Sequence, residues 1–431
     1  MTDFLWQKSP TDIDHKIMAF MAGQDVILDR QLFVYDLQAS SAHVKGLASI
    51  GVLQSGEADI LLEALETLKQ EFLSGSFVLD ERFEDGHSAI ETWLTGKLGE
   101  LGKRVHTGRS RNDQVLVATR LLLRDRLEQL QTSCSDTARL CLERARLSAE
   151  LPMPGYTHLQ RAVVSSAGMW FAAFAESFID NAALARDTRD WIDANPLGTA
   201  AGFGVNLALD RELTTRELGF SRMQVNPIHA QNSRGKYEIQ ALGAFAQALL
   251  DVRRLAWDLS LYSTSEFNFV RLPDRFTTGS SIMPNKRNPD LVELLRAAYP
   301  GVQAAILELQ SLLSLSSGYH RDLQNTKPPL LRGLELGGAV MEIVPDLIAS
   351  LEFNPETMQQ AMEPAMHATD RAMELAAEGV PFRDAYRTVM TEMPELATRD
   401  ALQSVRARVS PGGCANLMLE ELGQRLEQLA R

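Results

Sequence analysis

A loop-forming stretch in the C-terminal half of the chain carries the most reactive set of side chains. Thr278-Gly-Ser-Ser-Ile-Met-Pro-Asn-Lys-Arg-Asn-Pro-Asp290 lies between two helical segments and places two serines directly after a glycine. Lys286 adds a mobile positive charge six residues beyond Ser280. A hydroxyl, free backbone N–H groups and an ammonium group can together stabilise a developing anion. An ordinary Gly/Ser turn with a solvated lysine would have the same composition.

Three further polar stretches interrupt a chain that is otherwise helical in pattern. His106–Gln114 contains arginines that can bind carboxylates through paired hydrogen bonds. Gly155–Gln160 contains His158, a residue type suited to general acid or base catalysis near neutral pH. Tyr319–Lys327 is a dense run of hydrogen-bonding groups. Taken singly, each stretch also fits a polar turn at the end of a helix.

The elements that must position these stretches are long helices. Apolar spacing predicts five of them. The first begins at Val115, and the other four span Ser165–Asn195, Tyr237–Val270, Asp290–Ser317 and Leu330–Leu351. In the first of these, a spacing of four, three, four, three and four residues forms a heptad seam through Leu123, Leu127, Leu130, Cys134, Thr137 and Cys141.

Helices of this length need partners along their whole extent. A helix of about thirty residues is roughly 45 Å long, so five of them predict an all-α bundle and an oligomer. The first hundred residues read as shorter helices, and Asn354-Pro355-Glu356 begins a smaller C-terminal part. Alternation typical of strands is scarce. We therefore predict helical domains over residues 1–108, 109–353 and 354–431, the second holding the bundle.

Net charge, cysteine content and hydropathy disfavour several classes of protein. The 431 residues have a net charge of -13, which disfavours nucleic acid as a partner. The three cysteines show no metal-binding spacing and suit a reducing compartment. We find no basic-then-apolar leader and no run apolar enough to span a bilayer, so we expect a cytoplasmic protein without a membrane partner.

The four polar stretches together resemble the argininosuccinate lyase family of the fumarase/aspartase superfamily. The serine loop matches Gly-Ser-Ser-x-Met-Pro-x-Lys-x-Asn at every fixed position. His106-Thr-Gly-Arg-Ser-Arg-Asn-Asp-Gln114 has the form that argininosuccinate lyases carry, whereas fumarases, aspartases and adenylosuccinate lyases differ there. Gly155–Gln160 and Tyr319–Lys327 agree as well. The resemblance extends from about Leu5 to about Arg383.

The resemblance implies a three-domain all-α fold whose long helices form the core of a homotetramer, with each active site shared between subunits. It implies the reversible cleavage of argininosuccinate to arginine and fumarate, the last step of arginine biosynthesis, without a cofactor or metal. Ser280 would be the base, Lys286 would stabilise the anionic intermediate, His158 would act on the leaving nitrogen, and Glu293 would orient that histidine. The positions implied to bind substrate are His87, Arg111, Asn112, Thr157, Tyr319, Gln324 and Lys327.

The sequence also departs from the family pattern. Met21-Ala22-Gly23 stands where Asn-Ala-Ser is usual, Gly86 interrupts the usual Glu-Asp-Ile-His, and Arg234-Gly-Lys236 replaces Asp-Arg-Asp. These changes indicate a divergent branch. They leave open a modified substrate, but none removes Ser280, Lys286 or His158. Two alternatives are another fumarate-releasing lyase, such as one like adenylosuccinate lyase, and a non-catalytic structural protein like the δ-crystallins. The form of His106–Gln114 argues against the first, and the retained serine loop and histidine argue against the second.

Overall fold

The structure is a computed structural model, and it describes residue 20 and residues 23–397 and 399–429. Two departures from the family pattern lie outside the described residues. They are Met21 and Ala22, and Leu5-Trp-Gln-Lys-Ser-Pro10, where relatives often have Leu-Trp-Gly-Gly-Arg-Phe. The chain divides into two compact units. The three domains predicted from the sequence stay a prediction.

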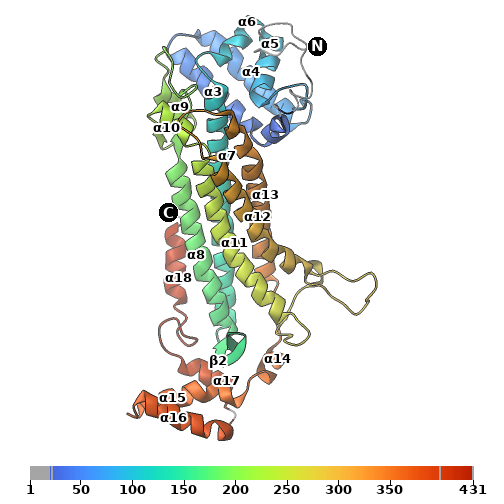
Figure 1. Cartoon of the computed structure of the whole chain (residues 1–431), viewed down its shortest axis with the longest axis vertical. Helices are drawn as coiled ribbons and strands as arrows, with labels where there is room; N and C mark the ends of the chain where they lie inside the picture. Colours follow the sequence, from blue (N-terminus) through green and yellow to red (C-terminus); the bar gives the residue numbers. More distant parts are fainter. Residues whose placement is uncertain (1–19, 21–22, 398, 430–431) are drawn as a thin grey trace. The chain divides into compact units, whose positions relative to one another are not determined.

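Unit 1 comprises Met1–Asp125, Arg189–Gln240 and Leu307–Leu331. Short helices dominate it (Figure 1). Their apolar side chains form a buried core that includes Phe33, Leu47 and Leu65. Its shorter elements are α2 (Asp25–Leu28), η1 (Asp29–Gln31), α3 (Phe33–Ser49), α4 (Ser55–Leu73), α5 (Gly86–Leu98), α6 (Glu100–Lys103), η2 (Arg104–His106), β3 (Ala194–Asn195), α9 (Arg211–Glu217), β4 (Arg222–Met223), α10 (Pro227–Asn232) and η4 (Arg321–Thr326).

Unit 2 comprises Arg126–Thr188, Ala241–Ile306 and Arg332–Arg431. Its shorter elements are β1 (Pro152–Thr157), β2 (Gln160–Ser166), β5 (Val270–Arg271), η3 (Asp274–Phe276), β6 (Glu352–Phe353), α14 (Pro355–Gln360), η5 (Pro364–His367), α15 (Ala368–Ala377), α16 (Phe382–Glu392), η6 (Met393–Glu395), α17 (Ala401–Ala407) and α18 (Leu419–Leu429).

Five of the helices that the structure describes are 23 residues long or longer, as the apolar spacing predicts. They are α7 (Arg111–Leu147), α8 (Ala167–Ile192), α11 (Lys236–Tyr262), α12 (Asp290–Leu312) and α13 (Lys327–Ala349). All six residues of the predicted heptad seam in α7 are buried. The all-α architecture is therefore confirmed, and the strands are confined to short pairs.

Two predicted helices are too long. Apolar spacing extends the third long helix to Val270 and the fourth to Ser317, but α11 ends at Tyr262 and α12 at Leu312. Beyond α11, Thr264 Oγ1 donates to the Leu261 carbonyl at 2.8 Å and accepts from the N–H of Phe267 at 3.2 Å. Such side-chain bonds compete with the helical ladder.

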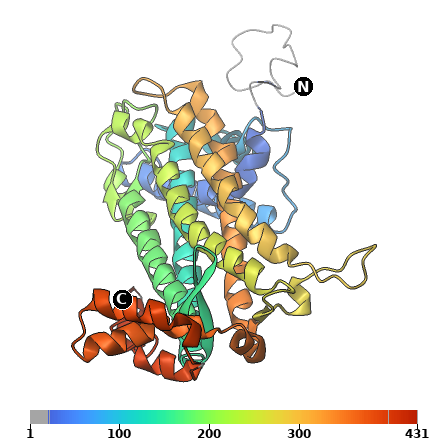
Figure 2. The same ribbon diagram turned by 60° about the horizontal axis from the view of Figure 1, so that its bottom comes forward.

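Strands β1 and β2 form an antiparallel hairpin that the sequence reading did not anticipate. Thr157 pairs with Gln160, so His158 and Leu159 form a two-residue turn. Their φ angles are 52° and 58°, the left-handed pair that a tight hairpin turn requires. The hairpin contacts the C-terminal helices of unit 2, coloured red in Figure 2.

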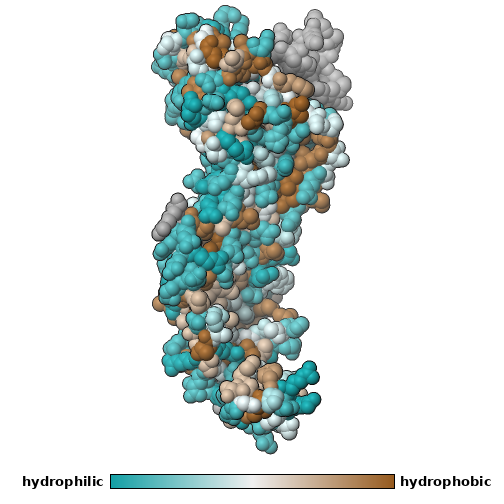
Figure 3. Space-filling view, turned by 90° about the vertical axis from the view of Figure 1, so that its left-hand side faces the viewer, coloured by the Kyte–Doolittle hydropathy of each residue, from teal (hydrophilic) through white to brown (hydrophobic). Residues whose placement is uncertain are grey.

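The C-terminal part begins as predicted, with the Asn354 side chain capping α14. The last helix, α18, is tied to α8 by Arg425, which donates to Glu176 and Asp180 at 2.6 Å each. Its outward surface is hydrophilic (Figure 3). Among the described residues, no helix is both long and apolar enough to cross a membrane.

Candidate active site

A polar pocket of about 390 Å³ lies within unit 1. Segments far apart in the sequence line it, including the end of the α4–α5 loop, the start of α7 and the segment around η4. Six of the seven residues predicted to bind substrate are among its lining residues: His87, Arg111, Asn112, Tyr319, Gln324 and Lys327.

The buried carboxylate of Asp113 fixes the start of α7 beside the pocket. Its Oδ1 accepts the N–H of Ser110 at 2.9 Å, and its Oδ2 accepts the N–H groups of Gly198 and Ala200 at 3.0 and 2.9 Å. Burial raises the pKa of Asp113, and these N–H groups only partly offset that effect. Our sequence reading missed this residue, although Ser110-x-x-Asp113 has the spacing of a helix-capping pair.

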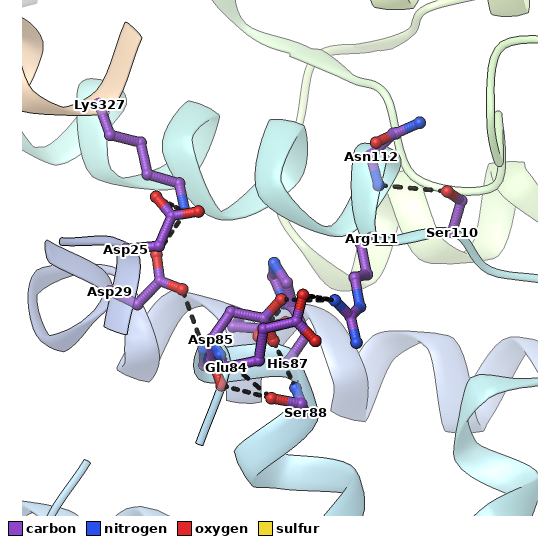
Figure 4. Close-up of polar contacts among 12 residues, drawn as sticks. Asp25, Asp29, Glu84, Asp85, His87, Ser88, Ser110, Arg111, Asn112 and Lys327 are labelled. Atoms are coloured by element: carbon purple, nitrogen blue, oxygen red, sulfur yellow. Dashed lines mark hydrogen bonds and ion pairs between the residues drawn. The ribbon is translucent and has the colours of Figure 1, made fainter. Parts of the chain in front are cut away.

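Arg111 is paired with two carboxylates in front of α5. Its Nη1 lies 2.8 Å from Glu84 Oε1 and 3.2 Å from Asp85 Oδ2 (Figure 4). Burial lowers the pKa of Arg111, but Asp85 and Glu84 outweigh it and raise the net value. Asp85 also caps α5 by accepting the N–H of Ser88 at 2.7 Å. Two ion pairs thus hold the guanidinium at the pocket wall, and one of the two acids is itself fixed in place as the cap of α5.

His87, in the first turn of α5, contacts the carboxylate of Asp36 through Nδ1. Burial lowers the pKa of His87, but the charge of Asp36 and its hydrogen bond raise it above the ordinary value. Nε2 is buried without a hydrogen-bond partner among the described residues. A protonated His87 therefore has a free donor.

Lys327 begins α13 and is only 5% exposed. Its Nζ lies 2.6 Å from Asp29 Oδ1 and 3.3 Å from Asp25 Oδ1 (Figure 4). Burial lowers its pKa, but Asp29 and Asp25 outweigh that effect and keep the ammonium protonated. Asp29 Oδ2 also accepts the N–H of Gly86 at 2.9 Å. Asp29 and Asp36 were not among our predicted site residues, because an acid within a short amphipathic helix gives no distinct signal.

The pocket is richer in cations than the chain as a whole. Five lining residues carry a permanent positive charge: Arg109, Arg111, Arg234, Arg321 and Lys327. Three lining residues are acids: Asp25, Glu84 and Asp85. Burial and the charge of Arg109 lower the pKa of His106 to about 4, so that this histidine is neutral at pH 7. The lining suits a ligand with several carboxylates and at least one cationic group.

The remaining predicted site residues lie in unit 2 and do not line this pocket. Thr157 and His158 are exposed at the tip of the β1–β2 hairpin. The left-handed conformation of His158 is uncommon for a residue with a side chain, and such positions are frequent at functional sites.

The serine loop projects away from those parts of α11, α12 and α13 that belong to unit 2 (Figures 1 and 2). Its base is closed by Thr278 and Asn288, which exchange N–H···O bonds of 3.0 and 2.8 Å. Within it, Ser280 Oγ accepts the N–H groups of Ile282 and Met283 at 3.3 and 3.0 Å. The role of Ser280 as the base stays a prediction. Lys286 is exposed on the same loop.

Glu293, in the first turn of α12, forms an ion pair of 3.2 Å with Arg296. It lies one turn beyond the serine loop, as the sequence predicts. Its expected role in orienting His158 stays a prediction. In the part of the chain that the structure describes, no group of three or more His, Cys, Asp or Glu side chains is arranged to hold a metal ion.

Comparison with known proteins decides the family. Residues 14–303 match a family model described as a lyase. A protein from Xanthomonas oryzae pv. oryzae named argininosuccinate lyase is 56% identical over 431 residues, the full length of both chains. The proteins of that name from Stenotrophomonas maltophilia and Xylella fastidiosa are 54% and 56% identical, covering all of this chain and 100% and 97% of their own. The chain belongs to the argininosuccinate lyase family.

Solved structures of other proteins have the same fold as this chain. An EDDS lyase crystallised with formate superposes with a TM-score of 0.82 at 24% identity, covering 96% of this chain and 90% of its own. A class II fumarase from Schistosoma mansoni gives 0.73 at 16% identity, with 96% and 94% covered. At these identities the likeness concerns the fold alone.

Proposed function

We infer that the chain is a carbon–nitrogen lyase that cleaves argininosuccinate reversibly to arginine and fumarate, the last step of arginine biosynthesis. The observation that carries this is the unit 1 pocket, where six family substrate-binding positions from separate segments come together. The full-length relatives at 54–56% identity support the same activity. They do not favour an activity like that of adenylosuccinate lyase or a crystallin-like structural role.

The charges of the pocket fit this substrate. Argininosuccinate carries three carboxylates, an α-ammonium group and a substituted guanidinium. Arg111 and Lys327 each form an ion pair with an acid, so their positive charges are largely neutralised within the pocket wall. They can still donate hydrogen bonds to a ligand. Asn112, Tyr319 and Gln324 add neutral groups that can set the orientation of the ligand.

The elimination removes a proton from a carbon beside a carboxylate and then breaks the adjacent C–N bond. Ser280 is the base. A serine hydroxyl is too weakly acidic to ionise unaided, and its two backbone N–H donors stabilise the alkoxide. Lys286, on the same loop, stabilises the negative charge that develops on the substrate carboxylate, a contact worth roughly 3–4 kcal/mol in preorganised sites.

His158 acts on the leaving-nitrogen side, where it protonates the departing guanidino group directly or through water. Glu293 orients it, and Thr157 binds the succinate part of the substrate beside it. Thr157, His158 and Glu293 are exposed in the single chain, whereas elimination chemistry requires a site that excludes water. We therefore expect these residues to act only where further segments of the protein cover them.

We propose that a homotetramer closes the site, with the segments His106–Gln114, Gly155–Gln160 and Gly279–Asn288 drawn from three subunits. The long helices support this, since their length favours packing against further copies. The enzyme works in the cytoplasm without cofactor, metal, nucleic acid or membrane. Its three cysteines are free and buried, which suits a reducing compartment.

The test is fumarate release, followed by ultraviolet absorbance, from argininosuccinate and from adenylosuccinate under the same conditions. We expect turnover of argininosuccinate and none of adenylosuccinate. Release from adenylosuccinate alone would assign the chain to another branch, and no release from either would favour a structural role.

A further inference from the structure

One buried cation of the unit 1 pocket has no part in the function described above. Arg234 lies on the turn between α10 and α11 and lines the pocket together with Tyr319 and Lys327. Its residue is only 5% exposed. Its Nε donates to the neutral hydroxyl of Thr326 over 3.4 Å, which is a long hydrogen bond. The guanidinium keeps its charge at pH 7.

Arg234 differs from Lys327 and Arg111 in having no counter-ion in contact. Over the described residues, no carboxylate lies within ion-pair distance of it, whereas the other two have such partners. Burial lowers the pKa of Arg234, and the more distant Tyr319 and Glu238 offset this only in part. A buried charge without a partner is costly. An anionic group that enters the pocket would remove that cost.

The turn holds the guanidinium in place. Gly235 has a φ of +82°, and a Cβ there would come within 2.5 Å of Leu313 Cδ2, so this position requires glycine. On the other side, Ser233 is fully buried; its Oγ donates to the Ala230 carbonyl at 2.7 Å and accepts from Gln224 Nε2 at 3.1 Å. A backbone fixed at both neighbours is the kind of support that a binding residue needs.

An acid accompanies this arginine. Asp25 lines the same pocket. Burial raises its pKa, and Lys327, whose Nζ lies 3.3 Å away, and then Arg234, outside contact distance, offset this only in part. The α-carbon of an amino acid carries a carboxylate and an ammonium group, so its recognition calls for a cation and an anion close together. The fumarate end of the substrate has two carboxylates and no ammonium group. The pair therefore suits the arginine end.

We propose that Arg234 binds the α-carboxylate of the arginine part of the substrate, with Asp25 facing its α-ammonium group. This assignment rests on the proposed function, and it adds a specificity-determining residue to it. Arg234 would make the enzyme select ligands that carry a free α-carboxylate.

Calorimetric titration of the assembled, full-length enzyme with arginine and with agmatine tests this. Agmatine is arginine without its α-carboxylate. The wild type should bind arginine more tightly. In Arg234→Gln, arginine should bind about 10- to 100-fold more weakly, the range for a lost charge-assisted hydrogen bond. Agmatine affinity should stay within about threefold, as for a change that touches no group of that ligand.

Two further variants sharpen the result. Lys236→Gln removes an exposed charge two residues away and should alter neither affinity. Arg234→Lys keeps the charge without the planar fork and should weaken arginine binding to an intermediate degree. Both ligands are titrated into the same preparation of each variant. Any loss of folded protein therefore affects both titrations equally and does not change the ratio of the two affinities. An unchanged arginine affinity in Arg234→Gln, or equal losses for both ligands, would overturn the assignment.

The outcomes also separate this inference from the proposed function. Wild-type protein that selects arginine through Arg234 but releases no fumarate from argininosuccinate would support the assignment and refute the lyase activity. Wild-type protein that cleaves argininosuccinate, with Arg234→Gln showing unchanged selectivity, would refute only the assignment.

Discussion

Lys327 and Gly86 are held together by one carboxylate. Asp29 accepts the Lys327 ammonium with Oδ1 at 2.6 Å and the N–H of Gly86 with Oδ2 at 2.9 Å. The start of α13 and the start of α5 are thereby fixed to each other, although they lie far apart in the sequence. A residue outside the ligand-contacting set thus determines the distance between two walls of the pocket.

We therefore expect Asp29→Asn to lower stability and substrate affinity together. Removing one partner of a buried ion pair costs about 3–5 kcal/mol, because the other charge is left buried. Denaturant unfolding at one fixed protein concentration measures the first effect, and KM for argininosuccinate the second. Asp80→Asn, which breaks the exposed pair with Arg82, is the control and should change little. A KM that stays at the wild-type value would separate Asp29 from the site.

Ser280→Ala should abolish nearly all turnover while fold and assembly persist. The substitution removes a hydroxyl from a projecting loop, and loss of a general base lowers the rate by about 10²–10⁴-fold. Steady-state fumarate release and light scattering provide the two measurements. Ser281→Ala, one residue further on and exposed, is the matched control. If Ser280→Ala kept more than about a tenth of the rate, the loss would be smaller than the removal of a general base causes. The base would then have to be another residue.

The contact between His87 and Asp36 should make stability depend on pH. Because the pKa of His87 is raised in the folded protein, its contribution is fully present below the unfolded value of about 6.5 and is lost as pH rises through the raised value. The difference in unfolding free energy between wild type and His87→Gln should thus be larger at about pH 6 than at about pH 9.

His43 supplies the opposite case. Burial lowers its pKa to about 3, so wild-type stability is reduced as pH falls from about 6.5. His43→Gln should therefore gain stability relative to wild type over that fall. Urea unfolding of wild type and of each variant across the range gives the difference in unfolding free energy as a function of pH. If the wild-type advantage over His87→Gln grew as pH rises, the raised pKa of His87 would be wrong. If wild type did not lose stability relative to His43→Gln as pH falls, the lowered pKa of His43 would be wrong.

A shared site predicts complementation between inactive variants. In the proposed homotetramer, Ser280→Ala and His158→Ala chains would each lack one group in every site. After joint unfolding and refolding, hybrid tetramers should contain sites that receive both intact groups from different chains, and fumarate release should return. Each variant refolded alone is the control. Hybrids identified by mass that remain inactive would refute sites built from several subunits.

The sequence allowed the helices and the reactive loop to be predicted, because both depend on local patterns. The heptad seam in α7 and the cap at Asn354 concern residues a few positions apart. The carboxylates behind the site could not be predicted in the same way. Asp29 and Asp36 meet Lys327 and His87 only through the tertiary fold.

The hairpin that presents His158 was missed for a different reason. Hairpin turns of two residues are usually signalled by Asn-Gly or Asp-Gly, which adopt left-handed conformations easily. Here His158 and Leu159 adopt them, so the local signal is absent. The contacts of the hairpin with the C-terminal helices favour this conformation against local preference.

The three hydrogen bonds to Asp113 have a consequence for how this sequence can vary. Its carboxylate joins the start of α7 to Gly198 and Ala200, so neither stretch can be exchanged independently of the other. A lineage that replaced Asp113 would leave two amide groups unsatisfied in the interior, and the loop would have to be rebuilt at the same time. The two stretches should consequently diverge in concert, as correlated positions separated by more than eighty residues along the chain.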